Sequence, residues 1–219
     1  MITFEQIRKN EDIKTYIREA DASLRALGFT EHSFAHVEHV ASTAAEVLSA
    51  VGADAHTIEL AKIAGYLHDI GNIINRTDHS HTGALMAFRI LDKLGMPTKD
   101  ITAIITAIGN HDEGTGVPVN DVAAALILAD KSDVRRSRVR NSDIPSFDIH
   151  DRVNYSVESS ELKVDAEKKE ANLYLKINTE ISSIMNYFEI FLGRMLLCCK
   201  AAKALGLDFI LFINGQRFI

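Results

Sequence analysis

Five places along the sequence carry side chains that could hold a metal ion. In chain order they are His36, the adjacent pair His68 and Asp69, either His79 or His81, His111, and Asp130. Imidazole nitrogens combined with carboxylate oxygens suit Mn, Fe, Zn or Co, and no thiolate lies nearby in the sequence to shift that preference. These residue types predict a site for one or two divalent transition-metal ions per chain.

The pair His68 and Asp69 is unusual because its neighbours are apolar. These neighbours are Ile63, Ala64, Tyr66, Leu67 and Ile70. A carboxylate buried among them is strongly unfavourable unless it is paired or bound to a metal. Taken singly, each candidate has another interpretation: a lone histidine in an apolar helix is more often a core residue, Asp69 could cap the turn at Gly71, and Asp130 could be an ordinary helix-end residue. The metal hypothesis depends on their joint order.

That order, with its local context, resembles the HD superfamily of metal-dependent phosphohydrolases. The segments that carry the resemblance are HVEHVA (36–41), GYLHDIGN (65–72), HSHTGA (79–84), GNHDEGTGVPV (109–119) and LILADKSDVRRSRVR (126–140). Five spaced segments are more specific than any single motif. The resemblance covers about residues 28–140, and a DIH segment (148–150) that leads into strands resembles a poorly characterised bacterial and archaeal branch.

The resemblance implies an all-α fold with metal bound between helices, and a role for six residues. His36, His68, Asp69 and Asp130 would hold the first metal, while His79 and His111 would complete a second site that Asp69 bridges. Asp69 and His68 would thus be the catalytic pair. Two cations about 3.5–4 Å apart can clamp a phosphate and lower the pKa of a bridging water. Among neighbours, register favours His36 over His32 or His39, and spacing to Gly83 favours His79 over His81.

Two departures from the family pattern narrow this expectation. Many relatives have Lys where this chain has Asn72, and Arg76 could supply a cation from the same loop. Relatives of the HD-GYP type carry paired histidines and Gly-Tyr-Pro. Here Asn110 precedes His111 and Gly-Val-Pro occupies 116–118. These differences argue against specificity for cyclic-di-GMP and against a third metal.

A dense run of cationic residues follows Asp130. It contains Lys131, Arg135, Arg136, Arg138 and Arg140. The run could be a solvated helix end whose charges complement the helix dipole, or it could recognise phosphate, which the planar fork of arginine binds through two nitrogens. Under the second hypothesis, the candidate substrate-binding residues are Arg76, Lys131, Asp133, Arg136 and Arg138. Asp133 could instead pair with an arginine, and Glu113 is a further candidate for the same site.

The elements that must position these residues are mainly helical. Apolar spacing predicts helices over 37–48, 58–67, 82–94, 98–108 and from 120 to 130 or beyond. After Asn141 the pattern changes to alternation over 152–164 and 173–177, then a helix over 180–205 and a strand over 207–214. The predicted fold is mainly α: an HD-domain helical bundle over residues 1–145 and a small β-β-α-β appendage over 146–219, packed on it.

Composition excludes several classes of protein. The chain has 219 residues, a formal charge of −6 and 47% hydrophobic residues, which is a globular composition. The acidic charge argues against nucleic-acid binding. The adjacent cysteines Cys198 and Cys199 suit a reducing compartment, and the charged N-terminus and short apolar stretches argue against a leader or a membrane span. We expect a cytoplasmic protein, and the apolar helix over 181–197 with the small sheet could hold a homodimer.

The leading functional hypothesis is a metal-dependent phosphohydrolase or phosphodiesterase. Its substrate would be a small phosphate ester or anhydride, with a nucleotide the expected type, cleaved by a metal-activated hydroxide. The alternative is a regulatory HD module that keeps the metal and binds a phosphorylated metabolite without turnover. A di-iron oxygenase is a third possibility, because a few HD relatives use two irons on oxygen. Kinship of fold alone does not choose among these.

Overall fold

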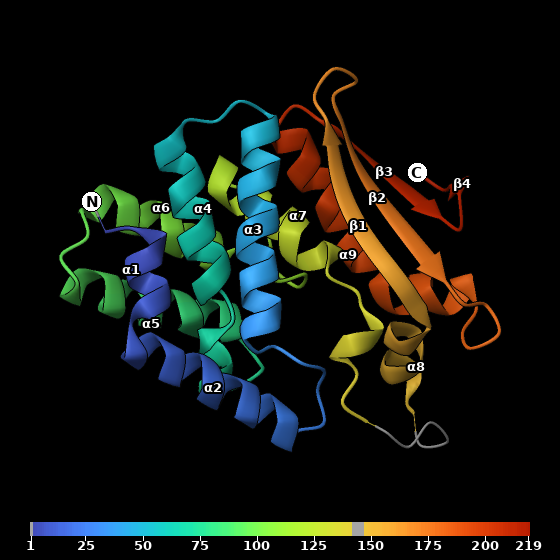
Figure 1. Ribbon diagram of the computed structural model, residues 1–219, viewed down its shortest axis with the longest axis horizontal. Coiled ribbons are helices and arrows are strands. Elements are labelled where there is room, and N and C mark those ends of the chain that lie inside the picture. Colours follow the sequence, from blue (N-terminus) through green and yellow to red (C-terminus); the bar gives the residue numbers. More distant parts are fainter. Residues whose placement is uncertain (1, 142–146) are drawn as a thin grey trace.

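A computed structural model describes residues 2–141 and 147–219 of the chain (Figure 1). The helical body contains α1 (Phe4–Lys9), α2 (Glu11–Ala26), α3 (Phe34–Ala50), α4 (Ala55–Leu67), η1 (Ile70–Ile73), α5 (His79–Lys93), α6 (Thr98–Gly109), α7 (Asp121–Ser132) and η2 (Arg136–Arg138). The C-terminal part contains α8 (Ile149–Ser156), β1 (Val157–Asp165), β2 (Glu170–Ile177), α9 (Ile184–Ala204), β3 (Asp208–Ile213) and β4 (Gln216–Arg217). The mainly α architecture with a small C-terminal sheet confirms the predicted fold class. The predicted domain boundary, between residues 145 and 146, lies outside the described residues.

Helix α7 is the central helix of the body. Asn120 caps it, since its side-chain oxygen accepts a hydrogen bond of 2.7 Å from the Ala123 amide. Every residue from Val122 to Ser132 is buried, because α7 packs against α3, α4, α6 and α9. A helix that is apolar on all sides belongs in a core. The polar residues at its C-terminal end, Asp130 among them, are therefore carried into the interior.

The C-terminal sheet has the strand order β1-β2-β3-β4. Strands β1 and β2 form an antiparallel hairpin, while α9 connects β2 to its parallel neighbour β3. Alternate residues of β2, Leu173, Leu175 and Ile177, are buried, whereas Tyr174 stacks on Phe212 on the other face. In Figure 1 helix α9 lies behind the strands, and it contacts β2 and β3 as well as α7. The sheet is thus fixed to the body through α9.

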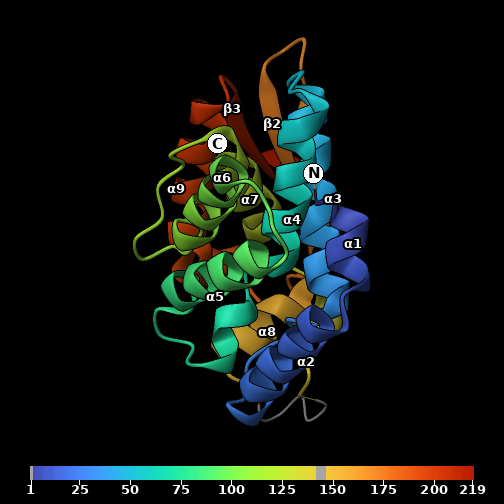
Figure 2. The same cartoon turned by 90° about the vertical axis from the view of Figure 1, so that its left-hand side faces the viewer.

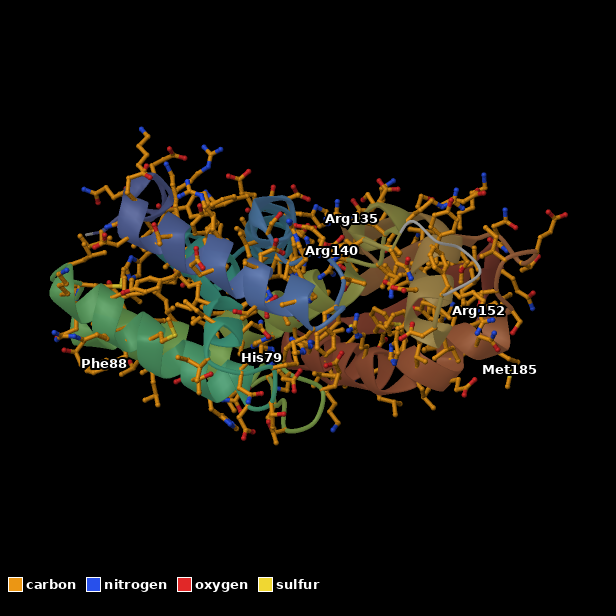
Figure 3. The ribbon with its side chains drawn as sticks, turned by 90° about the horizontal axis from the view of Figure 1, so that it is seen from below. His79, Phe88, Arg135, Arg140, Arg152 and Met185 are labelled. Atoms are coloured by element: carbon orange, nitrogen blue, oxygen red, sulfur yellow. The ribbon has the colours of Figure 1, made fainter. Side chains whose placement is uncertain are left out.

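Helix α9 is long and partly apolar on its outer side. Met185, Leu192 and Leu196 are exposed there, and Figure 3 shows Met185 protruding from the molecule. Within residues 2–141 and 147–219, no helix combines the length and the hydropathy that crossing a bilayer would require. The homodimer expected from this helix stays a prediction.

The predicted strand over 152–164 is wrong in its first part, where residues up to Ser156 form the end of α8. Asp148 starts this helix, since its Oδ1 accepts a hydrogen bond of 2.8 Å from the Asp151 amide. Val153 and Val157 are both buried, and their spacing of four satisfies helical as well as alternating periodicity. A fourth strand, β4, and the later start of α9 at Ile184 also differ from the prediction. Helix α8 also carries His150 in its first turn.

Two glycines allow the close approaches on which the site depends. A Cβ on Gly65 would lie 2.8 Å from Cα of Ala41, so its absence lets α4 pack tightly on α3. A Cβ on Gly71 would lie 2.0 Å from the carbonyl oxygen of His79, so η1 can pack against the start of α5. Figure 2 shows α3 and α4 side by side, with α5 crossing below them. These contacts bring three helix ends together.

Replacing Gly65 by alanine is expected to lower the free energy of unfolding by about 1–3 kcal/mol, the usual effect of overpacking a core. The colliding atoms belong to the backbone of α3, which cannot move aside as a flexible side chain would. Urea denaturation followed by circular dichroism measures this. Gly193→Ala in α9 is the matched control, since nothing lies within 4 Å of its Cβ position and alanine favours a helix. Equal stability of Gly65→Ala and wild type would contradict this account of the helix contact.

Candidate metal centre

Six of the residues that the sequence predicts as metal ligands meet in one buried cluster. Each comes from a helix end: His36 from the first turn of α3, His68 and Asp69 from the end of α4, His79 from the start of α5, His111 from just beyond α6, and Asp130 from the last turn of α7. All six are buried. Figure 3 shows His79 near the middle of the molecule. Residues far apart in the sequence are therefore close in space at this point.

The first group in the cluster is built on His36, His68 and Asp130. The Nε2 atoms of His36 and His68 are 3.3 Å apart, and Oδ1 of Asp130 lies 3.4 Å and 3.7 Å from them, respectively. Oδ2 of Asp69 lies 3.6 Å from Nε2 of His36 and 3.3 Å from Nε2 of His68. Two imidazole nitrogens and two carboxylate oxygens therefore surround one point.

The second group lies on the other side of Asp69. Oδ1 of Asp69 is 3.5 Å from Nε2 of His79, which is 3.2 Å from Nε2 of His111. Potential ligand atoms of His68, Asp69 and His111 also lie within 4.8 Å of one another. The two oxygens of Asp69 thus face two different pairs of histidines, and this carboxylate occupies the position that a bridging ligand needs.

The other nitrogen of each histidine ring is held by a hydrogen bond. The acceptors of the four Nδ1–H groups are a carboxylate oxygen of Asp133 for His36, and the carbonyl oxygens of Gly65 for His68, Arg76 for His79 and Ile108 for His111, at 2.6–3.1 Å. A carbonyl oxygen can only accept, so the proton of a neutral ring sits on Nδ1. The Nε2 atom of each ring then points into the cluster, as in histidines that bind metals.

The charge of the cluster fits a bound cation. Burial lowers the pKa values of His79 and His111, so both rings are neutral and their Nε2 lone pairs face each other without a proton between them. Burial alone would also lower the pKa of His68, but the carboxylates of Asp69 and Asp130 outweigh it and raise that pKa to about 10. The centre thus favours positive charge, and its nitrogen and oxygen donors suit Mn, Fe, Zn or Co.

The sequence suggests that Lys131 and Asp133 bind the substrate, but in the structure they contact two candidate metal ligands, Asp130 and His36, and do not line the cavity. Nζ of Lys131 is 2.7 Å from Oδ2 of Asp130 and 3.3 Å from Oε2 of Glu113, and the side chain is buried. Asp133 accepts the Nδ1–H bond of His36 at 2.7 Å and pairs with Arg135. Lys131 therefore neutralises the outer side of one ligand, and Asp133 orients another.

The structure separates the histidines that the sequence left as neighbours. His36 is fully buried in the cluster, whereas the side chain of His39 is 45% exposed. His79 is buried, whereas the side chain of His81 is 55% exposed beside Asp78. His32 takes an intermediate position, with Nε2 4.0 Å from Oδ2 of Asp69. His32 thus lies at the edge of the cluster, next to Asp69.

A cavity of about 380 Å³ adjoins the cluster. His32 and Arg76 line it from the body, and Nη1 of Arg76 is 3.4 Å from Nε2 of His79. Arg138 lines it as well, whereas Arg136 does not. Arg136 turns to α8, donating a hydrogen bond of 2.6 Å to the carbonyl of Tyr155 and lying over its ring. Of the predicted substrate-binding residues, Arg76 and Arg138 thus reach the cavity.

The C-terminal part also lines the cavity, and two of its residues there, His150 and Arg194, are absent from the site candidates that the sequence suggests. His150, in the first turn of α8, lies in the cavity wall. Arg194, in the middle of α9, lines the cavity as well. Its neighbours along the helix, Phe191 and Met195, are buried. A charge beside the buried face of a helix was a usable signal for a site residue.

Part of the chain matches a known protein family. Residues 33–140 match the family model of the HD domain. The chain is 24% identical over 214 residues to an uncharacterised protein of Methanocaldococcus jannaschii. The alignment covers 85% of this chain and 79% of the relative. A solved structure, a predicted HD superfamily hydrolase from an uncultured Thermotogales bacterium, is similar with a TM-score of 0.46 and 25% identity, covering 57% of this chain and 68% of that one.

Proposed function

Because residues 33–140 of this chain form an HD domain, we propose that the protein is a metal-dependent phosphohydrolase. Its substrate would be a phosphate ester or anhydride of a small, nucleotide-like molecule. One observation carries the proposal. Four histidine Nε2 atoms and two carboxylates converge beside a cavity that contains arginine. A metal site next to an anion-binding cavity is what phosphoryl transfer requires.

The residues divide into two sets that would hold one ion each. His36, His68, Asp69 and Asp130 would hold the first, while Asp69, His79 and His111 would hold the second. Divalent ions bound here would lower the pKa of a bound water and offset charge on the phosphoryl oxygens. Asp69 is common to both sets because its two oxygens face opposite ways.

The remaining residues position the ligands and the substrate. Arg76 lies beside His79 and, in the described parts of the chain, has no carboxylate within ion-pair distance, so its guanidinium is available to phosphoryl oxygens. Asn72 links a candidate metal ligand to this arginine, since its side chain donates a hydrogen bond to Oδ1 of Asp69 and accepts one from Arg76. Asp133 and Lys131 hold His36 and Asp130 from behind. The ligands are therefore fixed before a substrate arrives.

The proposal is tested by removing metal with a chelator and restoring Mn, Fe, Co or Zn singly. We expect elemental analysis to find up to two ions per chain, and at least one of the metals to raise hydrolysis of p-nitrophenyl phosphate, bis(p-nitrophenyl) phosphate or nucleotides by more than about 100-fold. Stoichiometric metal binding without hydrolysis of any ester in this panel would overturn the proposal. The regulatory module that binds a phosphorylated metabolite would then be the better hypothesis.

A further inference from the structure

Three arginines line the cavity beside the cluster of histidines and carboxylates. Arg76 comes from the loop before α5, Arg138 from the end of η2 and Arg194 from α9. Arg138 is 5% exposed, and the Arg194 side chain is 24% exposed. The first two belong to the HD domain and the third to the C-terminal part. Two parts of the chain thus contribute positive charge to one enclosed space.

The guanidinium groups of Arg138 and Arg194 are held in place by contacts that do not use all of their N–H donors. Arg138 donates from Nε to the carbonyl of Glu31 at 2.9 Å and from Nη1 to the carbonyl of Asp133 at 2.8 Å, and its Nη2 makes no hydrogen bond to the described residues. Arg194 lies over the ring of Phe191 at 4.5 Å, and its Nε is 2.5 Å from Oε1 of Glu113. Rigid, partly satisfied guanidinium groups are suited to bind a further anion.

The carboxylates near these arginines are already shared. Glu113 serves both Arg194 and Lys131, and Asp133 serves Arg135 and His36 as well as Arg138. Both guanidinium groups line the same cavity, and, after burial itself, repulsion by the charge of Arg194 is among the influences that lower the pKa of Arg138. Divalent ions in the cluster would add more positive charge. An anion in the cavity would relieve this repulsion.

We propose that Arg138 and Arg194 form a second anion subsite, separate from the place beside Arg76 where the reacting phosphate binds. The substrate is then an organic phosphate whose unreacted part carries a second phosphate or carboxylate. Asp148, which caps α8, and Asp151, in its first turn, also line the cavity, and they suit the hydroxyl-bearing part of such a molecule. This inference rests on the proposed function, and it gives the C-terminal part a role in substrate selection.

The test compares matched substrates that differ by one phosphate. Fructose 1,6-bisphosphate is compared with fructose 6-phosphate, and adenosine 3′,5′-bisphosphate with adenosine 5′-monophosphate, on the metal-loaded full chain. We expect at least one bisphosphate to have a kcat/KM more than about 30-fold above that of its partner, which is the worth of a charged hydrogen-bonded pair. In Arg194→Ala this ratio should fall to within about threefold of one. Lys200→Ala, an exposed cation on the same helix, should keep the wild-type ratio.

The outcomes separate this inference from the proposed function. Hydrolysis without preference for either bisphosphate, or a preference that survives in Arg194→Ala, overturns the second subsite and leaves the phosphohydrolase intact. If no ester is hydrolysed, the proposed function fails. The subsite is then tested by calorimetry: the bisphosphate should bind more than about 30-fold more tightly than its monophosphate partner in wild type, and within about threefold in Arg194→Ala. Should Arg194→Ala fail to fold, Arg194→Gln keeps the bulk of the side chain and removes its charge. Metal content of each variant shows whether the loss arises at the subsite or at the ligands.

Discussion

Asp69→Ala is expected to lose bound metal and to reduce phosphatase activity by at least about 10⁴-fold, the size of effect seen when a central catalytic group is removed. Asp69 contributes an oxygen to each histidine group: Oδ2 faces His68 and Oδ1 faces His79. Without it, the neutral nitrogens of His79 and His111 would lose the carboxylate that faces His79 at 3.5 Å. Neutral donors alone bind divalent ions weakly, so the second position should empty first.

Elemental analysis and p-nitrophenyl phosphate hydrolysis, measured on the same preparations, check this prediction. Asp92→Ala is a suitable control because Asp92 is an exposed acid in α5, away from the cluster. Asp69→Asn keeps the shape of the side chain and its bond to Asn72, so it separates loss of charge from loss of packing. Full metal occupancy in Asp69→Ala would show that Asp69 is not a ligand.

The helical body was predictable because its signals are local. Helix α7 is an apolar run with an Asn cap, and the pair His68 and Asp69 stands out because it follows apolar residues at the end of a helix. Periodicity, capping and residue type are properties of short segments. That six candidate ligands from five segments meet at one point is not a local property. Resemblance to a family supplied that step, and the structure places all six together.

The cavity could not be read from the sequence for the same reason. Five cations follow one another after Asp130, but η2 turns Arg136 toward Tyr155 and Arg138 toward the cavity. Positions two apart in a tight helix point in very different directions, so a run of charges does not say which one reaches a ligand. Arg194 enters from a helix that follows two strands. Its role depends on how α9 packs on α7, which is a tertiary contact.

Asp133→Asn is the second large effect that the structure predicts, and it distinguishes two roles for this residue. The sequence allowed Asp133 to bind a substrate hydroxyl. In the structure it is buried and accepts the Nδ1–H bond of His36, with Arg135 and Arg138 as ion-pair partners. Those neighbours outweigh the effect of burial and hold the pKa of Asp133 well below its usual range, so it is a carboxylate. A carboxylate behind a ligand histidine fixes its ring and raises its basicity.

Loss of that carboxylate is expected to weaken metal binding by about 10- to 100-fold, the usual effect of removing a partner of a ligand histidine. Metal titrations monitored by activity measure this directly. At saturating metal, the KM for p-nitrophenyl phosphate should stay within about threefold of wild type, because Asp133 has no surface in the cavity. The opposite pattern, a raised KM with unchanged metal affinity, would show that Asp133 contacts the substrate and does not position His36. Because Asn can still accept the bond from His36, the expected loss reports the missing charge, and a larger loss in Asp133→Ala would measure the orientation of the ring separately.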